Sequence, residues 1–301
     1  LTGLSRRRRL VSQEASVKYF LLGALSSAIF LYGIALVYGA AGSFQLGIIA
    51  QASMTQISGS KIFAAGMILL AVGLLFKVGA VPFHNWTPDV YTGAPSPVTA
   101  FMSIATKMVA VLGLMRVMYV ALGAMRWDWQ LLLAVVAVAS MAVGAIVGLS
   151  QTDMKRMLAY SSIAHAGFIM VGVVGAYTLQ TGQRPDQTGS VSSVLIYLAG
   201  YGLATIGFFM VILMVRKAGG ESTEIDSWAG LGRRHPMLGA LIVLFMLSFA
   251  GIPATAGFTG KLFVFLAGWR GGYAWLVLLG VIFSLVAAYF YLHVIYVVFF
   301  K

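Results

Sequence analysis

The sequence predicts an all-α, polytopic membrane protein with about eight spanning helices. Hydrophobic residues make up 60% of its 301 residues and charged residues only 9%, and the mean hydropathy is +0.93. Soluble domains carry about 45–50% apolar and about 25% charged residues, so this composition excludes a water-soluble globule. Runs of about 20 apolar residues recur along the chain, and helices satisfy the backbone of such runs in lipid.

The expected spans begin and end near charged, aromatic or turn-forming residues. Arg6–Arg9 precede the first span, a Gly/Pro-rich turn at 93–97 opens the third, Trp127 and Trp129 precede the fourth, and Trp269 precedes the last. Tryptophan is typical of the membrane interface. In order, the eight expected spans are residues 15–40, 61–90, 96–122, 130–150, 157–178, 191–215, 237–267 and 272–300.

No connection between these spans is long enough to form a soluble domain. The longest, near 41–60, 179–190 and 216–236, are rich in Gly, Ser, Thr, Gln or charged residues. Residues 1–301 are therefore expected to form a single transmembrane domain. The chain opens on Leu1 without a signal peptide, which favours a fragment that begins between two membrane helices.

Basic residues divide unequally between the two sides of the membrane. Alternating spans place 11 on one side and 4 on the other, and the richer side is expected to be cytoplasmic. The net charge of +12 therefore reflects topology rather than nucleic-acid binding. The first side holds Arg6–Arg9, Lys155, Arg156, Arg216, Lys217, Arg233, Arg234 and Lys301, and the second holds Lys61, Arg126, Arg184 and Arg270.

The five remaining basic residues lie within the expected spans. Lys18 and Arg116 are near span ends, where a long side chain can reach the headgroups. Lys18 also follows Glu14 by one helical turn and could pair with it. Lys77, Lys107 and Lys261 lie too deep to reach an interface without a bend in the helix.

A charged side chain at mid-bilayer costs about 2.5–3.5 kcal/mol on insertion scales. The chain has only eight acidic residues, and none lies clearly at a span centre. Each deep lysine could still be structural, held by a carbonyl or a carboxylate. A buried amine without an acid beside it can also release its proton near neutral pH. This predicts proton or ion handling by Lys77, Lys107 and Lys261.

Two of the lysine-bearing spans contain a proline that should break the helix. Pro82 follows Lys77 by five residues, and Pro253 precedes Lys261 by eight. Interior proline removes a helix hydrogen bond and kinks the helix. Broken helices at corresponding positions of two halves are typical of transport sites between inverted repeats.

Two histidines accompany the lysines. His84 lies seven residues beyond Lys77, on the same face if the helix continues through the kink. His165 has hydroxyl neighbours at Ser161 and Ser162. Either imidazole could carry a proton or could be a hydrogen-bonded structural group. The other two histidines are in a loop and late in the last span, so no metal or haem pair is indicated.

The sequence lacks the residues or motifs of several kinds of cofactor site and active site. Without cysteine, the chain has no thiolate iron–sulfur ligand, cysteine zinc site or disulfide of its own. It has no GxGxxG, P-loop or nucleophile–base motif, so no nucleotide binding is expected. Asp89, at the end of the second span, is either a helix-end carboxylate or a proton entry point.

Four segments resemble a known family. Residues 14–23, 76–95, 153–165 and 251–261 are similar to subunit N of bacterial NADH:quinone oxidoreductase, respiratory complex I. The resemblance covers essentially all 301 residues, and the stretch VPFHNWTPDVY at 81–91 is its most specific part. It implies an antiporter-like, proton-pumping membrane subunit of fourteen helices, with two inverted repeats that each contain a broken helix, in the bacterial inner (plasma) membrane.

The resemblance also implies roles for individual residues. Lys77 and Lys261 match the broken-helix lysines of the two halves, Lys107 matches the central lysine, and His84 matches a polar link between them. Lys18 matches a lysine of lesser role. The family's key glutamate lies in a helix before Arg6, which has no counterpart here, and Glu14 is a different position.

Cofactors and partners follow from the same resemblance. NAD, FMN, iron–sulfur clusters and quinone would bind other subunits, and none would bind this chain. Its expected partners are the neighbouring antiporter-like subunit M, the small subunits K and J, the lipid bilayer, protons and water, with no nucleic acid. Conformational and electrostatic changes would couple redox chemistry elsewhere to this subunit.

Three alternatives remain open from the sequence. The nearest is a subunit of a multi-subunit monovalent cation/proton antiporter, which would have the same fold and no redox partner. The second is a direct redox or quinone-binding subunit, because a quinone pocket needs neither cysteine nor a histidine pair. The third is a purely structural assembly subunit, in which the three lysines could be replaced without loss of pumping.

Overall fold

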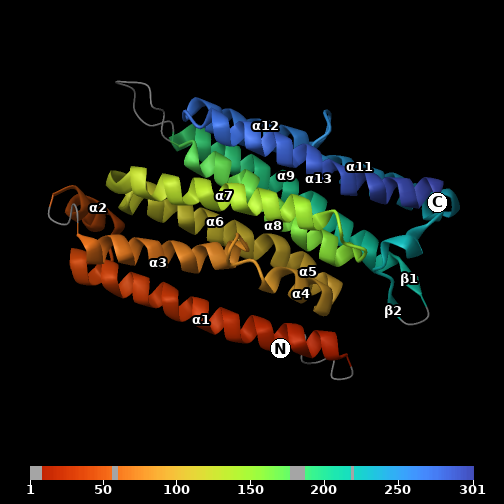
Figure 1. The fold of residues 1–301 in the computed structure, drawn as a ribbon, viewed down its shortest axis with the longest axis horizontal. Helices are drawn as coiled ribbons and strands as arrows, with labels where there is room; N and C mark the ends of the chain where they lie inside the picture. Colours follow the sequence, from red (N-terminus) through yellow and green to blue (C-terminus); the bar gives the residue numbers. More distant parts are fainter. Residues whose placement is uncertain (1–8, 56–59, 177–186, 218–219) are drawn as a thin grey trace.

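The chain folds into a bundle of long helices that run roughly in one direction (Figure 1). The structure is a computed structural model and describes residues 9–55, 60–176, 187–217 and 220–301. The α-helices are α1 (Leu10–Ala41), α2 (Leu46–Thr55), α3 (Lys61–Val78), α4 (Trp86–Gly93), α5 (Ser96–Phe101), α6 (Lys107–Arg116), α7 (Arg126–Gly148), α8 (Met154–Val174), α9 (Gln187–Met214), α10 (Leu231–Arg234), α11 (Pro236–Ala250), α12 (Ala256–Arg270) and α13 (Ala274–Phe300).

Four short helical segments and one strand pair complete the described part. Two are π-helical, η1 (Met102–Thr106) and η2 (Val117–Ala121), and two are 3₁₀, η3 (Gly123–Met125) and η4 (Ile225–Trp228). Strands β1 (Arg216–Lys217) and β2 (Gly220–Glu221) pair antiparallel, with Arg216 opposite Glu221.

The prediction of about eight spans is confirmed. Among the described residues, seven helical stretches are long and apolar enough to cross a membrane. One of them, Ser96–Ala121, is continuous through α5, η1, α6 and η2. The eighth expected span, 237–267, is divided between the shorter helices α11 and α12.

Both predicted helix breaks are present. Helix α3 ends at Val78, and Gly79 adopts the left-handed conformation with φ of 78° before α4 begins. Helix α11 ends at Ala250, and Gly251 does the same with φ of 81° before α12 begins. Glycine adopts positive φ without a steric penalty, so it ends these helices where proline prevents their continuation.

Helix α8 lies at the centre of the bundle and α1 at its edge. In the most apolar 18-residue stretch of α8, 94% of the residues are buried, whereas in that of α1 only 17% are buried. Helix α8 packs against α7, α4 and α12. At Gly144 of α7, a Cβ atom would lie 2.4 Å from the backbone nitrogen of Ala164, so glycine allows α7 and α8 to approach closely.

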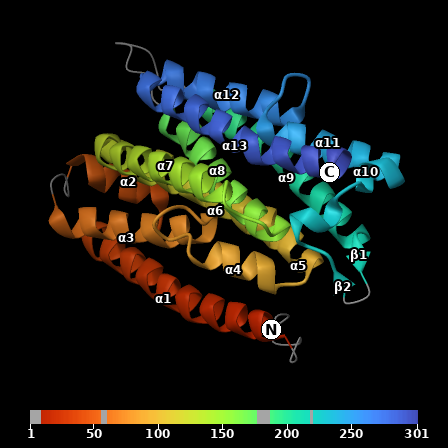
Figure 2. The same ribbon diagram turned by 45° about the vertical axis from the view of Figure 1, so that its right-hand side comes forward.

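The two ends of the bundle differ in charge. The end that carries both chain termini and the β1–β2 pair also holds Lys155, Arg156, Arg233 and Arg234, and we call it the basic end (Figures 1 and 2). Lys61, Arg126 and Arg270 lie at helix ends on the opposite side. The described residues thus follow the predicted topology. Arg6–Arg8 and Arg184 lie outside the described residues, as does the side chain of Lys217.

Some boundaries differ from the sequence-based expectation. Helices α1 and α7 begin at Leu10 and Arg126, earlier than the expected 15 and 130, because helices extend past the apolar core into the interface. The expected connection 41–60 contains α2, an apolar helix too short to span a bilayer, which packs against η2. The expected connection 216–236 contains β1, β2, η4 and α10.

Candidate functional site

Lys107 is buried at the centre of the bundle, and among the described residues no carboxylate pairs with it. It begins α6 directly after η1, and only 3% of it is exposed. Its Nζ donates to the carbonyl oxygen of Ser162 at 2.6 Å and to the Ser162 hydroxyl at 2.5 Å. The same Nζ lies 5.5 Å from the ring centroid of Tyr201, a cation–π distance. Backbone, hydroxyl and aromatic groups therefore surround this amine.

His165 occupies the next turn of α8 and bonds through both ring nitrogens. Its Nδ1 lies 2.6 Å from the hydroxyl of Tyr197, and its Nε2 lies 3.2 Å from the hydroxyl of Tyr291. The Tyr291 hydroxyl also bonds that of Ser161, next to the Lys107 partner in the chain. The ring stacks on Tyr201 with centroids 4.5 Å apart. Each bond can run in either direction, depending on the tautomer.

Lys261 lies on the other side of His165, in the second turn of α12. Its Nζ donates to the carbonyl oxygens of Phe249 and Ala250, both at 2.9 Å, and to the Ser284 hydroxyl at 2.8 Å. These carbonyls are the last two of α11, where the helix dipole favours a cation. Only 5% of Lys261 is exposed. The broken helix thus supplies the site that holds its own lysine.

His165 connects the two lysines through aromatic rings and hydroxyls. Tyr201 contacts both Lys107 and His165, and Phe168 contacts both His165 and Lys261. A cavity of about 10 Å³ lies between His165, Tyr197, Tyr201 and the α11–α12 break. That volume is at the lower limit for one water molecule. We call Lys107, Ser162, His165, Tyr291 and Lys261 the polar axis.

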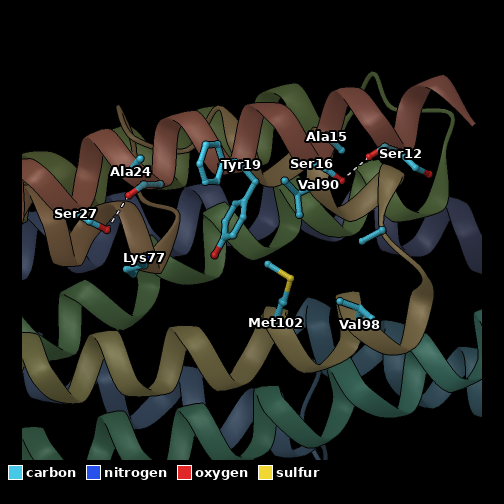
Figure 3. A pocket seen from close by; sticks show the side chains of 13 residues that line it. Ser12, Ala15, Ser16, Tyr19, Ala24, Ser27, Lys77, Val90, Val98 and Met102 are labelled. Carbon is cyan, nitrogen blue, oxygen red and sulfur yellow. Dashed lines mark hydrogen bonds between the residues drawn. The ribbon is translucent and has the colours of Figure 1, made fainter. Parts of the chain in front are cut away.

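Lys77 lies apart from the polar axis, at the end of α3. It is half-buried, and it lines a cavity of about 400 Å³ between α1, the α3–α4 pair and α5 (Figure 3). Its Nζ is 5.9 Å from the ring centroid of Tyr19. The hydroxyl-bearing residues Ser16 and Ser27 also line this cavity. The structure therefore places Lys77 beside a partly polar cavity.

His84 does not share a helical face with Lys77. The condition for that prediction, a helix continuous through the kink, is not met, because α3 ends at Val78 and His84 lies in the turn before α4. Within the described residues, its Nδ1 is buried and has no hydrogen-bond partner. The bond from Tyr91 of α4 to Ser162, at 3.2 Å, instead connects the first break to the polar axis.

Lys18 pairs with two acids at the basic end. Its Nζ lies 2.6 Å from Glu14, as the i,i+4 spacing predicted, and 2.8 Å from Asp89. Asp89 also pairs with Arg156 of α8 at 3.1 Å. This surface network connects α1, α4 and α8. Exposed ion pairs such as these contribute little stability.

A second ion pair at the basic end is buried. Lys155 is only 1% exposed and lies 2.6 Å from the carboxylate of Glu221, which also accepts a bond from Ser96 at 2.8 Å. Burial by itself would raise the pKa of Glu221, but Lys155 and Ser96 hold the pKa below its usual range. The pair attaches the β1–β2 pair to α8 and to the start of α5. The sequence indicated only a surface loop for Lys155.

Comparison with known proteins identifies the family. Residues 2–287 match the family described as NADH:quinone oxidoreductase/Mrp antiporter, TM. The chain belongs to this family. NADH-quinone oxidoreductase subunit N of Cutibacterium acnes is 74% identical over 301 residues, which are 100% of this chain and 56% of that protein. The chain thus spans about half the length of the curated relatives that it matches.

Solved structures share the fold. A chain of respiratory complex I from Thermus thermophilus with bound aureothin has a TM-score of 0.81 and 37% identity, over 100% of this chain and 62% of that one. A chain of the Mrp complex from Dietzia sp. has a TM-score of 0.84 and 22% identity, over 97% of this chain and 52% of that one. The second likeness shows the fold alone.

This member of the NADH:quinone oxidoreductase/Mrp antiporter family is a multi-pass protein of the bacterial inner (plasma) membrane. No group of three or more His, Asp or Glu residues that could hold a metal occurs in the part of the chain that the structure describes. The atoms around Lys107 and Lys261 are neutral acceptors and aromatic rings. Such a site suits the movement of protons better than the binding of a large ligand.

The sequence did not identify the tyrosines that contact His165 in this family member. Tyr197 and Tyr201 are one turn apart on α9, a spacing that also fits ordinary core packing. Tyr291 lies late in the last span, where nothing in the local sequence indicates that it bonds His165. Only the packing of α8 between α9 and α13 brings these hydroxyls to one imidazole.

Proposed function

We propose that this chain forms the proton-translocating part of subunit N of NADH:quinone oxidoreductase. One observation carries the proposal: Lys107 and Lys261 are buried on opposite sides of His165, and neutral oxygens hold both amines. Neutral acceptors can bind either an ammonium or, with a hydroxyl as donor, an amine. The charge of each lysine can therefore change without loss of its hydrogen-bonding site.

The residues take different roles in this proposal. Lys77, Lys107 and Lys261 hold and release protons. His165 passes a proton between the central and the terminal lysine, with Tyr197 and Tyr291 orienting its ring. Water molecules complete the route where no bond joins two groups, first of all beside Lys77, where a cavity is present.

His84 and Lys18 have secondary roles. His84 lies in the α3–α4 turn between Lys77 and the residues of α4, where its unbonded Nδ1 can accept a proton or a water molecule. Lys18 sets the charge on Asp89 and so the orientation of α4. The bond from Tyr91 to Ser162 would carry a shift of α4 to Lys107.

The driving force in this mechanism is a change of charge near one lysine. At an effective dielectric constant of about 20, a unit charge about 4 Å away contributes roughly 4 kcal/mol. A tenfold change in the ratio of protonated to neutral lysine requires about a third of that energy. Proton arrival at His165 would therefore favour release from Lys107 or Lys261.

NADH oxidation and quinone reduction belong to other subunits in this proposal. NAD, FMN, iron–sulfur clusters and quinone would bind there, and this chain would perform no redox chemistry. Subunits M, K and J would be its neighbours in the membrane. Support comes from the Cutibacterium acnes relative, which is named NADH-quinone oxidoreductase subunit N, and from the match to a chain of Thermus thermophilus complex I.

The test is made on the whole complex with the full-length subunit. Lys77→Ala, Lys107→Ala and Lys261→Ala should each abolish NADH-driven proton uptake by vesicles while the complex still assembles, and NADH oxidation should fall with it. Lys61→Ala, an exposed lysine at a helix start on the opposite end, is the control. Normal uptake by assembled complexes that carry the three core substitutions would instead support a structural subunit.

A second candidate is a subunit of a multi-subunit monovalent cation/proton antiporter. The description of the matching family favours it, because that family includes both NADH:quinone oxidoreductase and Mrp antiporter subunits. The two functions differ in their energy source. Cation-driven proton movement in vesicles without NADH or quinone would favour the antiporter, and strict dependence on NADH would exclude it.

A further inference from the structure

A groove at the basic end combines an apolar floor with a cationic rim. It lies between the end of α9 and the start of α11 and has a volume of about 580 Å³. Its apolar lining includes Met214, Met237 and Leu241, which we call the floor, and its basic lining residues are Arg216, Arg234 and His235, which we call the rim. Met237 is 81% exposed and Met214 69%, so neither is covered by the described chain.

The depth of the groove corresponds to the membrane surface. Helix α9 ends at Met214, and α11 begins at Pro236, so the floor belongs to the ends of two membrane helices. Of the rim residues, Arg216 lies in β1 after the end of α9, Arg234 ends α10, and His235 lies directly before α11. The elements β1 and α10 are both at the basic end of the bundle (Figure 2). Phospholipid phosphates lie at the level where apolar helix surface gives way to basic residues.

The charge of the rim is complementary to an anion. Arg216 uses its Nε to bond the Leu213 carbonyl at 3.1 Å, which points to a fixed rather than a freely moving side chain. Within the described residues, neither Arg216 nor Arg234 forms an ion pair with a carboxylate, and no acid lines the groove. The first turn of α11 adds the positive end of a fifteen-residue helix.

We infer that this groove binds an anionic glycerophospholipid of the leaflet at the basic end. Its phosphodiester would lie between Arg216, Arg234 and the start of α11, and its acyl chains would lie along Met214, Met237 and Leu241. Arginine suits this role because its planar fork binds phosphate oxygens in pairs. The inference does not depend on proton translocation, because none of these residues belongs to the polar axis.

The experiment uses the full-length protein within its whole, detergent-purified complex. Photoactivatable phosphatidylglycerol and photoactivatable phosphatidylcholine with identical acyl chains are crosslinked, and labelled peptides are mapped by mass spectrometry. Phosphatidylglycerol should label the segments around Met214 and Met237, and phosphatidylcholine should not. Near a membrane surface each arginine changes anionic-lipid affinity by about five-fold, so Arg216→Gln with Arg234→Gln should weaken labelling by about 25-fold.

Two further variants distinguish specific lipid binding in the groove from a general effect of surface charge and from loss of the fold. Arg233→Gln removes the same charge from the neighbouring exposed residue, which does not line the groove, and should keep the labelling. Arg216→Lys with Arg234→Lys should restore most of the selectivity for phosphatidylglycerol.

Four results would overturn the inference. Equal labelling by both lipids would indicate an apolar groove only, and an equal loss in Arg233→Gln would indicate diffuse charge. Competition by millimolar inorganic phosphate would indicate an ion site without lipid. Absence of labelling by either probe, with crosslinks to another protein segment, would show that protein covers the groove.

Discussion

Lys261 donates a 2.9 Å hydrogen bond to the carbonyl oxygen of Ala250 and so joins the two halves of its own broken helix. Ala250 is the last residue of α11, and Lys261 lies in the second turn of α12. The proline break frees carbonyls that an unbroken helix would use internally, and the lysine binds them. Helix break and lysine therefore form one structural unit.

Substitution by arginine should separate the structural and the protonic roles of Lys261. Lys261→Arg keeps a cation for the carbonyls of Phe249 and Ala250, but guanidinium does not release its proton in proteins. We expect an assembled complex with NADH-driven proton uptake reduced at least tenfold. Lys61→Arg, at an exposed position, is the control. Retained uptake in assembled Lys261→Arg would contradict a proton-releasing role.

Removal of one tyrosine hydroxyl should slow proton movement without loss of fold. Tyr197→Phe leaves Nδ1 of His165 without its 2.6 Å partner, and an unsatisfied buried polar group costs about 1–3 kcal/mol. We expect a roughly tenfold lower rate of proton uptake, measured in vesicles at constant NADH oxidation capacity. Tyr289→Phe, which is 65% exposed, should have no effect. Equal rates in both variants would remove Tyr197 from the proposed route.

The Lys155–Glu221 pair should make stability depend on acid pH. The pKa of Glu221 is lower in the folded protein than its ordinary value of 4.5, so the pair stabilises above that pH. The stabilisation is lost as the pH falls through the folded-state pKa. Thermal unfolding of the purified protein should therefore show a lower Tm at acid pH.

A matched pair of substitutions tests this source of acid sensitivity. Glu221→Gln should reduce Tm at pH 7, because Lys155 then has no charged partner at 2.6 Å, and should weaken the acid response. Glu224→Gln, three residues away and exposed, should leave both unchanged. An acid response of full size in Glu221→Gln would place its origin elsewhere.

Close packing between α7 and α8 should make Gly144 intolerant of even one methyl group. A Cβ there would lie 2.4 Å from Ala164 N and 2.6 Å from Tyr160 O, both backbone atoms. Gly144→Ala should therefore destabilise the bundle by about 1–3 kcal/mol in thermal or denaturant unfolding. Gly23→Ala in α1 meets nothing within 4 Å and should be neutral or slightly stabilising. Similar stabilities for the two variants would refute the packing argument.

The membrane fold and the two buried lysines could be predicted from sequence because lipid restricts the possibilities. The length of the apolar runs predicted the spans, and the positions of Lys107 and Lys261 deep within those runs predicted that both side chains are buried. The Pro82 and Pro253 breaks followed from proline chemistry alone. The roles of the site residues remain predictions.

The partners of those lysines could not be predicted, because they come from helices far apart in the chain. Ser162 is 55 residues from Lys107, and Tyr291 is 126 residues from His165. Lys155 also looked like a loop residue, since nothing local indicates that Glu221 covers it. His84 could share a face with Lys77 only if α3 continued through the kink, and Gly79 ends the helix before that point.

The π-helical segment η1 has a consequence for the direction of Lys107. A π turn holds one residue more than an α turn, so the chain after Thr106 is rotated by about 100° relative to an uninterrupted α-helix. Deletion of one residue within Met102–Thr106 should swing the amine away from Ser162 while α6 remains helical. The direction of the Lys107 side chain, as well as its depth, therefore brings its amine to Ser162.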